Sequence, residues 1–350
     1  RNTARPYEPM PVLLGVMRVT PDLAAQPYAW YEGDDQYLGV RLLGGINVHA
    51  VSDIAIGDTP IGNFADAAVY VNGFSGMASV PVPLHGNVDA VAGAALPWAN
   101  GSQWVSRTSS AGVIALQVDI EGRLYDSDPG SGTGLGPNAT TITLEYRAVG
   151  AAGWTAWRAE AISNNTTDTL RYTWQLDVPL GRYEVRARVD RPTWADPGDV
   201  CEFAWAQLKS IQPDTTDYSQ WGCLGIRIRA SGQLSGGLDT VRATYTPRPL
   251  PVWTPGGWVN ATTMEQGACN PGALVLQVLR GIRAPNGTLQ FGLGLADDQI
   301  DIDGLKAFML HCAARGYTYS KWITGAMSIG AVLEEIALAG MGQYMWIDGS

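Results

Sequence analysis

Residues 182–189 read Arg-Tyr-Glu-Val-Arg-Ala-Arg-Val, and apolar and charged side chains alternate through the whole stretch. Successive side chains of a β-strand point to opposite faces, so Tyr183, Val185 and Ala187 would share one face. The charged side chains between them would share the other face. The pattern therefore predicts a strand with one buried and one solvent-facing side.

Similar stretches surround this one, and together they predict a β-sandwich over residues 105–205. Short alternating runs recur at regular spacing, separated by turns rich in Gly and Asn: 113–120, 141–147, 154–158 and 169–178. Several short strands with turn residues between them are typical of a sandwich. Residues 126–136, mostly Asp, Ser, Pro and Gly, are expected to form a flexible loop, for which calcium binding is a minor alternative.

The flanking regions also favour strands. Residues 1–104 contain three candidate strands, at 12–19, 36–43 and 53–60, whereas 75–103 is expected to be irregular. Residues 206–255 add strands at 221–230 and 240–246. Pro249, Pro251 and Pro255 then predict a stiff connector.

From residue 270 onward the hydrophobic period becomes helical. Asn270 is expected to cap a first helix that starts at Pro271, Asp303 a second helix that ends before Gly316, and Ser328 a third. Residues 343–347 are expected to return to strand, and Asp348-Gly349 is a hairpin signal. The predicted fold class is mainly β with a smaller α+β C-terminal part.

Composition limits the possible functions. The chain has 350 residues, with 23 Lys and Arg against 33 Asp and Glu, a formal charge of −10, which argues against a surface that coats nucleic acid. Only 16% of residues are charged, as expected either for a surface covered by partner subunits or for a β-rich protein with many turns. No membrane span or signal peptide is predicted, and the abrupt ends, Arg1 and Ser350, are typical of a fragment.

Candidate chemical groups are few. Four carboxylates cluster at Asp297, Asp298, Asp301 and Asp303. They could hold a cation or act as an acid/base pair, but acidic residues before a helix more commonly stabilise its N-terminus. Glu334 and Glu335 follow on a helix, where one is expected to face solvent.

Cysteine and histidine form no metal or redox pattern. The cysteines are Cys201, Cys223, Cys269 and Cys312. Cys312 is expected to be a buried thiol, and a bridge between Cys201 and Cys223 is a less favoured option. The histidines, His49, His85 and His311, have no partner at helical spacing.

Two further features suggest binding only superficially. The Gly-rich run 130–136 contains no Lys, so a loop is favoured over a phosphate site. Trp154 and Trp157 are expected on opposite sides of a strand, either packing on the core and strand edge or with one ring stacked on a sugar. The sequence thus predicts no catalytic, cofactor-binding or metal-binding residue, no cofactor and no enzymatic activity.

Several short segments, in the same order along the chain, resemble the tail tip (host specificity) protein J family of long-tailed bacteriophages, the central tail hub. They are residues 104–108, Leu144-Glu145-Tyr146, 185–189, 206–211, 223–229, Asn270-Pro271-Gly272-Ala273 and Phe291-Gly292-Leu293-Gly294. Residues 2–7 and 57–60 are also similar to tail-protein variants of this family. Residues 181–187 resemble the late strand of a fibronectin type III module.

The resemblance implies a domain organisation and a role. It implies an N-terminal hub domain (1–104), a fibronectin type III-like insertion (105–205), returning hub strands and connector (206–255) and an α+β hub segment (256–350). The protein would be a homotrimer in the virion tail tip, made in the bacterial host cytoplasm. It would contact the distal tail protein, tail tip assembly proteins and the tape measure protein, and DNA would pass through its lumen without specific binding.

Two other classes remain open. A secreted carbohydrate-binding multi-domain protein predicts exposed, coplanar tryptophans. A cell-wall hydrolase predicts a cleft that pairs two carboxylates about 5–9.5 Å apart. In the hub reading, the chain ends before any fibre part, so host recognition is not expected in these residues.

Overall fold

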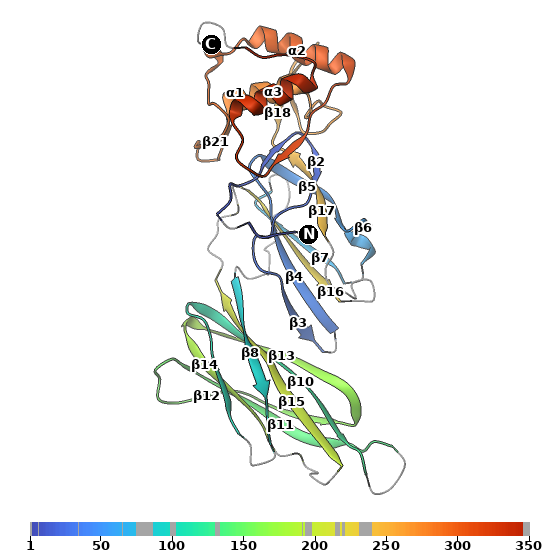
Figure 1. Ribbon diagram of the computed structural model, residues 1–350, viewed down its shortest axis with the longest axis vertical. Coiled ribbons are helices and arrows are strands. Elements are labelled where there is room, and N and C mark those ends of the chain that lie inside the picture. Colours follow the sequence, from blue (N-terminus) through green and yellow to red (C-terminus); the bar gives the residue numbers. More distant parts are fainter. Residues whose placement is uncertain are drawn as a thin grey trace. The chain divides into compact units, whose positions relative to one another are not determined.

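A computed structural model describes residues 2–5, 7–33, 35–64, 66–74, 87–98, 103–129, 134–190, 192, 198–213, 218, 221–230 and 240–345. The chain is mainly β, and the three α-helices of the described part all follow residue 270 (Figure 1). It divides into two units, unit 1 with Arg1–Ala24, Val40–Leu84 and Asp217–Ser350, and unit 2 with Ala25–Gly39 and His85–Thr216.

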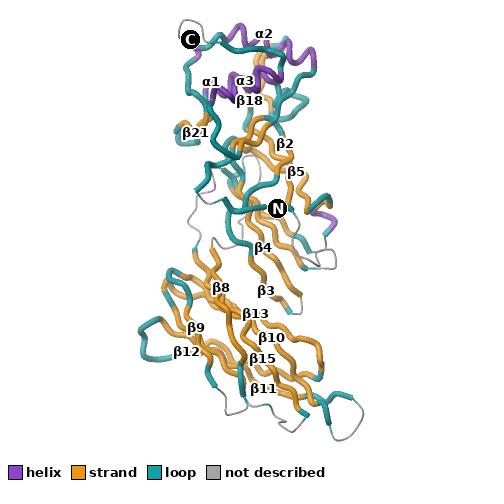
Figure 2. Tube along the Cα trace, viewed as in Figure 1, coloured by secondary structure: helices purple, strands orange, loops and turns teal. Residues whose placement is uncertain are grey.

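Unit 2 is built around a sandwich of two four-stranded antiparallel sheets, drawn as orange strands in Figure 2. One sheet has the order β13-β10-β15-β8, with bounds Thr166–Gly181, Val113–Asp126, Asp199–Gln212 and Asn87–Ala95. The other has the order β12-β11-β14-β9, with bounds Thr155–Asn164, Asn138–Ala148, Tyr183–Val189 and Val105–Thr108. The alternation at 182–189 is confirmed, because every second residue of β14 from Tyr183 to Val189 is buried.

The sandwich core is a single apolar cluster between the two sheets. It includes Leu116, Val118, Ile142, Leu144 and Trp205, all buried. The prediction that 75–103 is irregular is wrong for β8, which pairs with β15 from Asn87 to Ala95. Four of its nine residues are Ala and it lies at a sheet edge, so it lacks the β-branched alternation that marks a strand in sequence. The sandwich of the structure thus runs from Asn87 to Gln212, beyond the span 105–205.

A hairpin precedes the sandwich in sequence and belongs to unit 2. Strand β3 (Tyr28–Glu32) pairs antiparallel with the first half of β4 (Asp35–Leu43), so that Tyr28 is opposite Gly39. Strand β4 crosses the boundary between the units at residue 39.

Unit 1 begins with strands that the sequence predicted, though with one break. The apolar run 12–19 forms two strands, β1 (Val12–Leu14) and β2 (Met17–Val19). They are separated at Gly15, whose φ of +71° suits glycine. A Cβ at Gly15 would lie 2.5 Å from the carbonyl oxygen of Tyr319, so the chain bends where only glycine fits.

The β part of unit 1 is completed by short antiparallel pairs. Strand β17 (Val241–Pro247) pairs with β2 and with β5 (Val48–Ile56), which turns back into β6 (Thr59–Pro60) before η1 (Ile61–Asn63). Strand β16 (Cys223–Arg229) lies between β4 and β7 (Ala68–Asn72), and β1 pairs with β22 (Lys321–Ile323).

The predicted Pro-rich connector is a hairpin instead. Strand β18 (Leu250–Thr254) pairs with β19 (Gly257–Ala261), and Pro251 lies opposite Asn260. Both strands of a two-stranded sheet are edges, where proline is tolerated because one side of the strand needs no donor. A second small hairpin joins β20 (Ile282–Arg283) to β21 (Leu289–Phe291).

The helices end the described chain. Helix α1 (Pro271–Arg280) contacts both α2 (Ile302–Arg315) and α3 (Ile329–Ala339), and most of its residues are buried. The predicted caps Asn270 and Ser328 are confirmed, since each side chain accepts backbone N–H groups of the first turn. The predicted cap Asp303 is wrong: Asp301 caps α2, and Asp303 lies in its first turn. No strand forms at 343–345, and 346–350 lie outside the described residues.

Candidate functional site

The outer face of the sheet β13-β10-β15-β8 holds the polar groups of unit 2. On β10, Leu116, Val118, Ile120 and Leu124 belong to the core. The residues between them therefore point to the other face of the sheet. Of these, Gln117 and Asp119 are buried, whereas Glu121 and Arg123 are exposed. One half of the outer face is thus covered and the other half is open.

The covered half lies near the hairpin β3–β4. Lys209 Nζ lies 2.5 Å from Asp119 Oδ2 and also donates to the carbonyl oxygen of Ala29. Thr173 Oγ1 donates to Asp119 Oδ1 at 2.8 Å and accepts from the backbone N–H of Tyr31 at 2.9 Å. Burial of charge requires such pairing, and here the pairing also ties the hairpin to the sheet.

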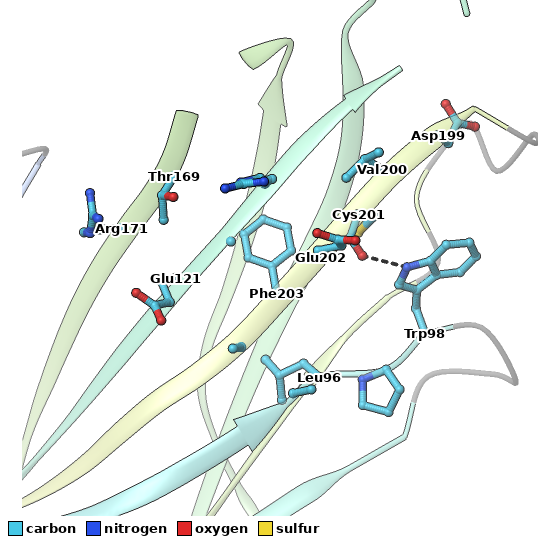
Figure 3. Close-up of a pocket in the computed structure, with 15 residues that line it drawn as sticks. Leu96, Trp98, Glu121, Thr169, Arg171, Asp199, Val200, Cys201, Glu202 and Phe203 are labelled. Atoms are coloured by element: carbon cyan, nitrogen blue, oxygen red, sulfur yellow. Dashed lines mark hydrogen bonds between the residues drawn. The ribbon is translucent and has the colours of Figure 1, made fainter. Parts of the chain in front are cut away.

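The open half forms a cleft of about 670 Å³ (Figure 3). Its charged and polar lining residues are Glu121, Arg123, Thr169, Arg171, Asp199 and Glu202. Its apolar lining includes Leu96, Pro97, Trp98 and Phe203. In Figure 3, Phe203 lies at the middle, between Arg171 and Thr169 on one side and Trp98 on the other.

Backbone packing fixes the strands beneath the cleft and one wall, and Gly122 and Phe203 lie on the core side of the sheet. A Cβ at Gly122 would lie 2.4 Å from the Phe203 ring and 2.3 Å from the Glu202 carbonyl oxygen. Only glycine therefore allows the Phe203 ring to lie against β10 at this point. At the wall, Trp98 Nε1 donates to the carbonyl oxygen of Cys201 at 2.8 Å, which fixes the plane of the indole.

Side chains of opposite charge face each other across neighbouring strands of the cleft. Arg123 lies opposite Glu202, and Arg171 lies opposite Glu121, on neighbouring strands. Within the described part of the chain, the side chains of Glu121, Arg123 and Glu202 take part in no ion pair or hydrogen bond. Arg171 lies over the ring of Tyr31, with its Cζ 5.8 Å from the centroid. The cleft therefore presents donors and acceptors that other groups of the chain leave free.

One thiol borders this cleft. Burial raises the pKa of Cys201 to about 11, more than the hydrogen bond with Thr140 lowers it. The Cys201 thiol is therefore protonated near neutral pH and a poor nucleophile. All four cysteines are free and buried, so the option of a bridge between Cys201 and Cys223 is wrong and the expected buried thiol at Cys312 is confirmed.

A second aromatic group lies in the other sheet of unit 2. The Arg186 guanidinium lies 4.2 Å from the ring centroids of both Trp104 and Trp154. Arg147 and Arg188 continue the row at 4.4 Å from Trp154 and 4.7 Å from Trp104. The Trp154 ring, which precedes β12, is thus engaged by arginines, whereas Trp157 packs against the core as the core-and-edge interpretation expects.

The acidic cluster has structural roles. Asp297 pairs with Arg280 at 2.7 and 2.8 Å, Asp301 accepts from Gly304 N at 2.9 Å, and Asp303 pairs with Lys306 at 2.8 Å. No group of three His, Cys, Asp or Glu side chains among the described residues is arranged to hold a metal ion. Of the two helical glutamates, Glu334 is exposed and Glu335 pairs with Lys321, as expected.

The remaining sequence candidates give no site. His311 packs near Tyr317, with ring centroids 5.8 Å apart, and His49 lies half-buried in β5. His85 and residues 130–133 of the Gly-rich run lie outside the described residues. Each helix of the described part is too short or too polar to cross a lipid bilayer.

Sequence reasoning did not single out the cleft residues Glu121, Arg123, Glu202 and Trp98. Charged residues alternate with Gly122 at 121–123, a pattern that indicates an open outer face. The opposing positions on β13 and β15 could not be read from the sequence, because the strand register is long-range.

Comparisons with known proteins identify no family. No family model and no curated protein matches the chain. Two solved structures of infectious bursal disease virus show low likeness. The VP2 subviral particle is 11% identical over 45% of this chain and 39% of that chain, with a TM-score of 0.22. The Gx strain structure is 9% identical over 67% of this chain and 60% of that chain, with a TM-score of 0.21.

A bacterial enzyme shows the same degree of likeness. The Arthrobacter globiformis T6 isomalto-dextranase complexed with panose is 10% identical over 53% of this chain and 36% of that chain, with a TM-score of 0.20. The chain spans less than two thirds of each of these three proteins. TM-scores near 0.2 indicate no shared fold, so no function follows from these likenesses.

Proposed function

We propose that this chain is a structural component of a long-tailed phage tail tip, the central hub that closes the tail tube and leads to the receptor-binding fibre. The observation that carries the proposal is the ordered series of segments, from Trp104 to Gly294, that resemble the tail tip protein J family. The role proposed is that of a scaffold without bond-making chemistry.

The placement of these segments supports the proposal. Residues 144–146 lie in β11, 185–189 in β14, 206–211 in β15 and 223–229 form β16. Asn270 caps α1, and the residues after it start that helix. These segments of the resemblance therefore fall mainly on residues that build strands and the start of a helix, whereas residues 292–294 lie in a loop after β21.

A homotrimeric hub would bury apolar groups between its copies, and unit 1 offers such groups. At and after the end of α3, Leu338, Met341 and Met345 are 61%, 77% and 67% exposed. Contiguous exposed apolar side chains commonly mark contact surfaces. Contacts with the distal tail, tip-assembly and tape measure proteins, and passage of DNA through the lumen, are part of the same proposal.

The rival carbohydrate-binding class predicts a platform of exposed, coplanar tryptophans. Among the described tryptophans, Trp258 is the exposed one, at 42%. It packs edge-on against Trp253, with an angle of 67° between the rings. This pair does not form the flat stacking platform that the rival class predicts.

Imaging and peptide mass analysis of purified phage particles test the proposal directly. The expected result is this chain at the distal end of the tail, in three copies. Its absence from purified particles would overturn the proposal.

The trimer contact has its own test. Size-exclusion chromatography with light scattering should give a trimer for the chain, and Leu338→Glu with Met341→Glu should shift it to a monomer. The matched control Met264→Glu, at a site 51% exposed elsewhere in unit 1, should leave the mass unchanged. A trimer that survives the double substitution would show that the end of α3 is not the interface.

A further inference from the structure

We propose that the open cleft on the sheet β13-β10-β15-β8 binds an uncharged oligosaccharide. This goes beyond the scaffold role, and it does not depend on it, because unit 2 carries the cleft whether or not the chain assembles into a hub. The proposal rests on the size of the cleft, its free polar groups, its aromatic wall and its charge balance.

The two halves of one sheet face differ in whether their polar side chains are paired. Toward the hairpin β3–β4, the polar groups of β10 and β15 are paired with each other, as in the ion pair of Lys209 and Asp119. Farther along the same strands, Glu121, Arg123 and Glu202 are exposed and unpaired within the described part. Polar groups that are held on a rigid sheet without internal partners are available to a ligand.

The second argument is the chemistry of these groups. Carboxylates accept two hydrogen bonds and a guanidinium donates several in a planar fork, so each can bind a pair of neighbouring hydroxyls. The register places one acceptor and one donor directly opposite each other twice, as Arg123 with Glu202 and Arg171 with Glu121. Each hydroxyl of a polyol can both donate and accept a hydrogen bond. A polyol therefore fits this arrangement of donors and acceptors better than a ligand that only donates or only accepts.

The third argument is the apolar surface beside the polar groups. Sugar rings have apolar C–H faces that pack on aromatic rings, and Trp98 lines the cleft with its indole N–H already satisfied by the Cys201 carbonyl. The indole therefore has its polar edge occupied, and its contribution to a ligand would be apolar. The volume of about 670 Å³ is within the usual range for small-ligand sites and can hold a short oligosaccharide.

The charge balance argues against anionic ligands. The cleft is lined by three carboxylates (Glu121, Asp199 and Glu202) and two guanidinium groups (Arg123 and Arg171), a formal balance of −1. Nucleic acids and other polyanions bind to clusters of positive charge, which this cleft lacks among its described lining residues. A neutral polyhydroxyl ligand suffers no repulsion here.

The test uses the full chain and an array of immobilised neutral oligosaccharides built from glucose, galactose and N-acetylglucosamine, with heparin as the anionic comparison. Calorimetry with the best array member then gives its affinity. Arg123→Gln and Glu202→Gln should each weaken binding about tenfold or more, because each removes a charge-assisted hydrogen bond. Both side chains are exposed, so the fold should tolerate either change, and thermal unfolding checks this.

Matched controls lie in the other sheet. Arg158→Gln and Glu160→Gln alter an exposed ion pair of β12, outside the cleft, and should leave the affinity unchanged. The proposal is overturned if no neutral oligosaccharide binds, if heparin binds better, or if the cleft variants bind as well as the controls. Because these readouts use the isolated chain, they are separate from the presence of the chain in phage particles.

Discussion

Lys209 Nζ lies 2.5 Å from Asp119 Oδ2, and the two side chains are only 6% and 10% exposed. The pair joins neighbouring strands, β15 and β10, on the outer face of the sandwich. Lys209 also donates to Ala29, and Asp119 accepts from Thr173, so the same two charges hold the hairpin β3–β4 and strand β13. The covered half of the sheet therefore depends on one polar network.

The first prediction follows from burial of this pair. Lys209→Met should lower the free energy of unfolding of unit 2 by about 3–5 kcal/mol, because it leaves Asp119 charged and buried without its partner. The double substitution Lys209→Met with Asp119→Leu should recover most of that loss, since no buried charge remains. Urea unfolding, followed by the fluorescence of buried tryptophans, measures both. Equal destabilisation of the single and double variants would contradict the role given to charge.

The second prediction concerns the edge strand β8. At Gly93, a Cβ would lie 1.6 Å from the carbonyl oxygen of Trp205, so any side chain must push β8 away from β15. Gly93→Ala should cost about 1–3 kcal/mol, as overpacking does, and should increase hydrogen exchange along 87–95. Gly153→Ala is the matched control, because nothing lies within 4 Å of its added Cβ. Similar exchange in the two variants would argue against tight packing of this edge.

The third prediction concerns the arginine between two indoles. Arg186→Met should destabilise unit 2 by about 1–2 kcal/mol, because it removes two cation–π contacts and the ion pair with Glu145. Arg158→Met is the control: that guanidinium has one cation–π contact, 5.3 Å from Trp174, beside its ion pair with Glu160, and is 43% exposed. The stability difference is read from thermal unfolding, and an equal loss in both variants would refute the special position of Arg186.

The fourth prediction concerns pH. Hydrogen bonds from Arg280 hold the pKa of Asp297 below its ordinary value. The folded pKa lies below the unfolded one, so this contribution to stability is present above the ordinary carboxyl pKa. It is lost as the pH falls through the folded pKa. In an NMR titration, Arg280→Gln should raise the pKa of Asp297 toward its ordinary value.

Asp303 serves as the internal control of that titration. Its pKa is also held low, by a hydrogen bond from Lys306, and should not change in Arg280→Gln. A shift of both carboxylates together would indicate a general change in the unit and not the loss of one ion pair.

Local patterns predicted the elements that depend on local physics. Strands β11, β14 and β17 show clean alternation, and the caps Asn270 and Ser328 stand beside helical periodicity. One miss arose where two signals competed. Asp301 and Asp303 are both good caps, and only the backbone geometry assigns the role to Asp301.

Other misses arose where pairing over long range decides the structure. Strand β8 has a weak strand composition and exists because β15 pairs with it. The cleft was also not predictable, because its open and covered halves differ only by the position of residues 28–39, far earlier in the chain. The sequence shows that Glu121 and Arg123 are charged. Whether their side chains have partners depends on the packing of the whole unit.

The course of the chain through unit 2 has a practical consequence for protein engineers. A fragment cut at residues 105 and 205 would lose all of β8 and the last residues of β15. The outer face of its sheet would also lose the hairpin that carries Ala29. The excised piece would expose an unpaired sheet edge and would leave Asp119 without Lys209, and it should aggregate. A transplantable module has to carry residues 85–216 together with the hairpin, grafted back by a designed linker.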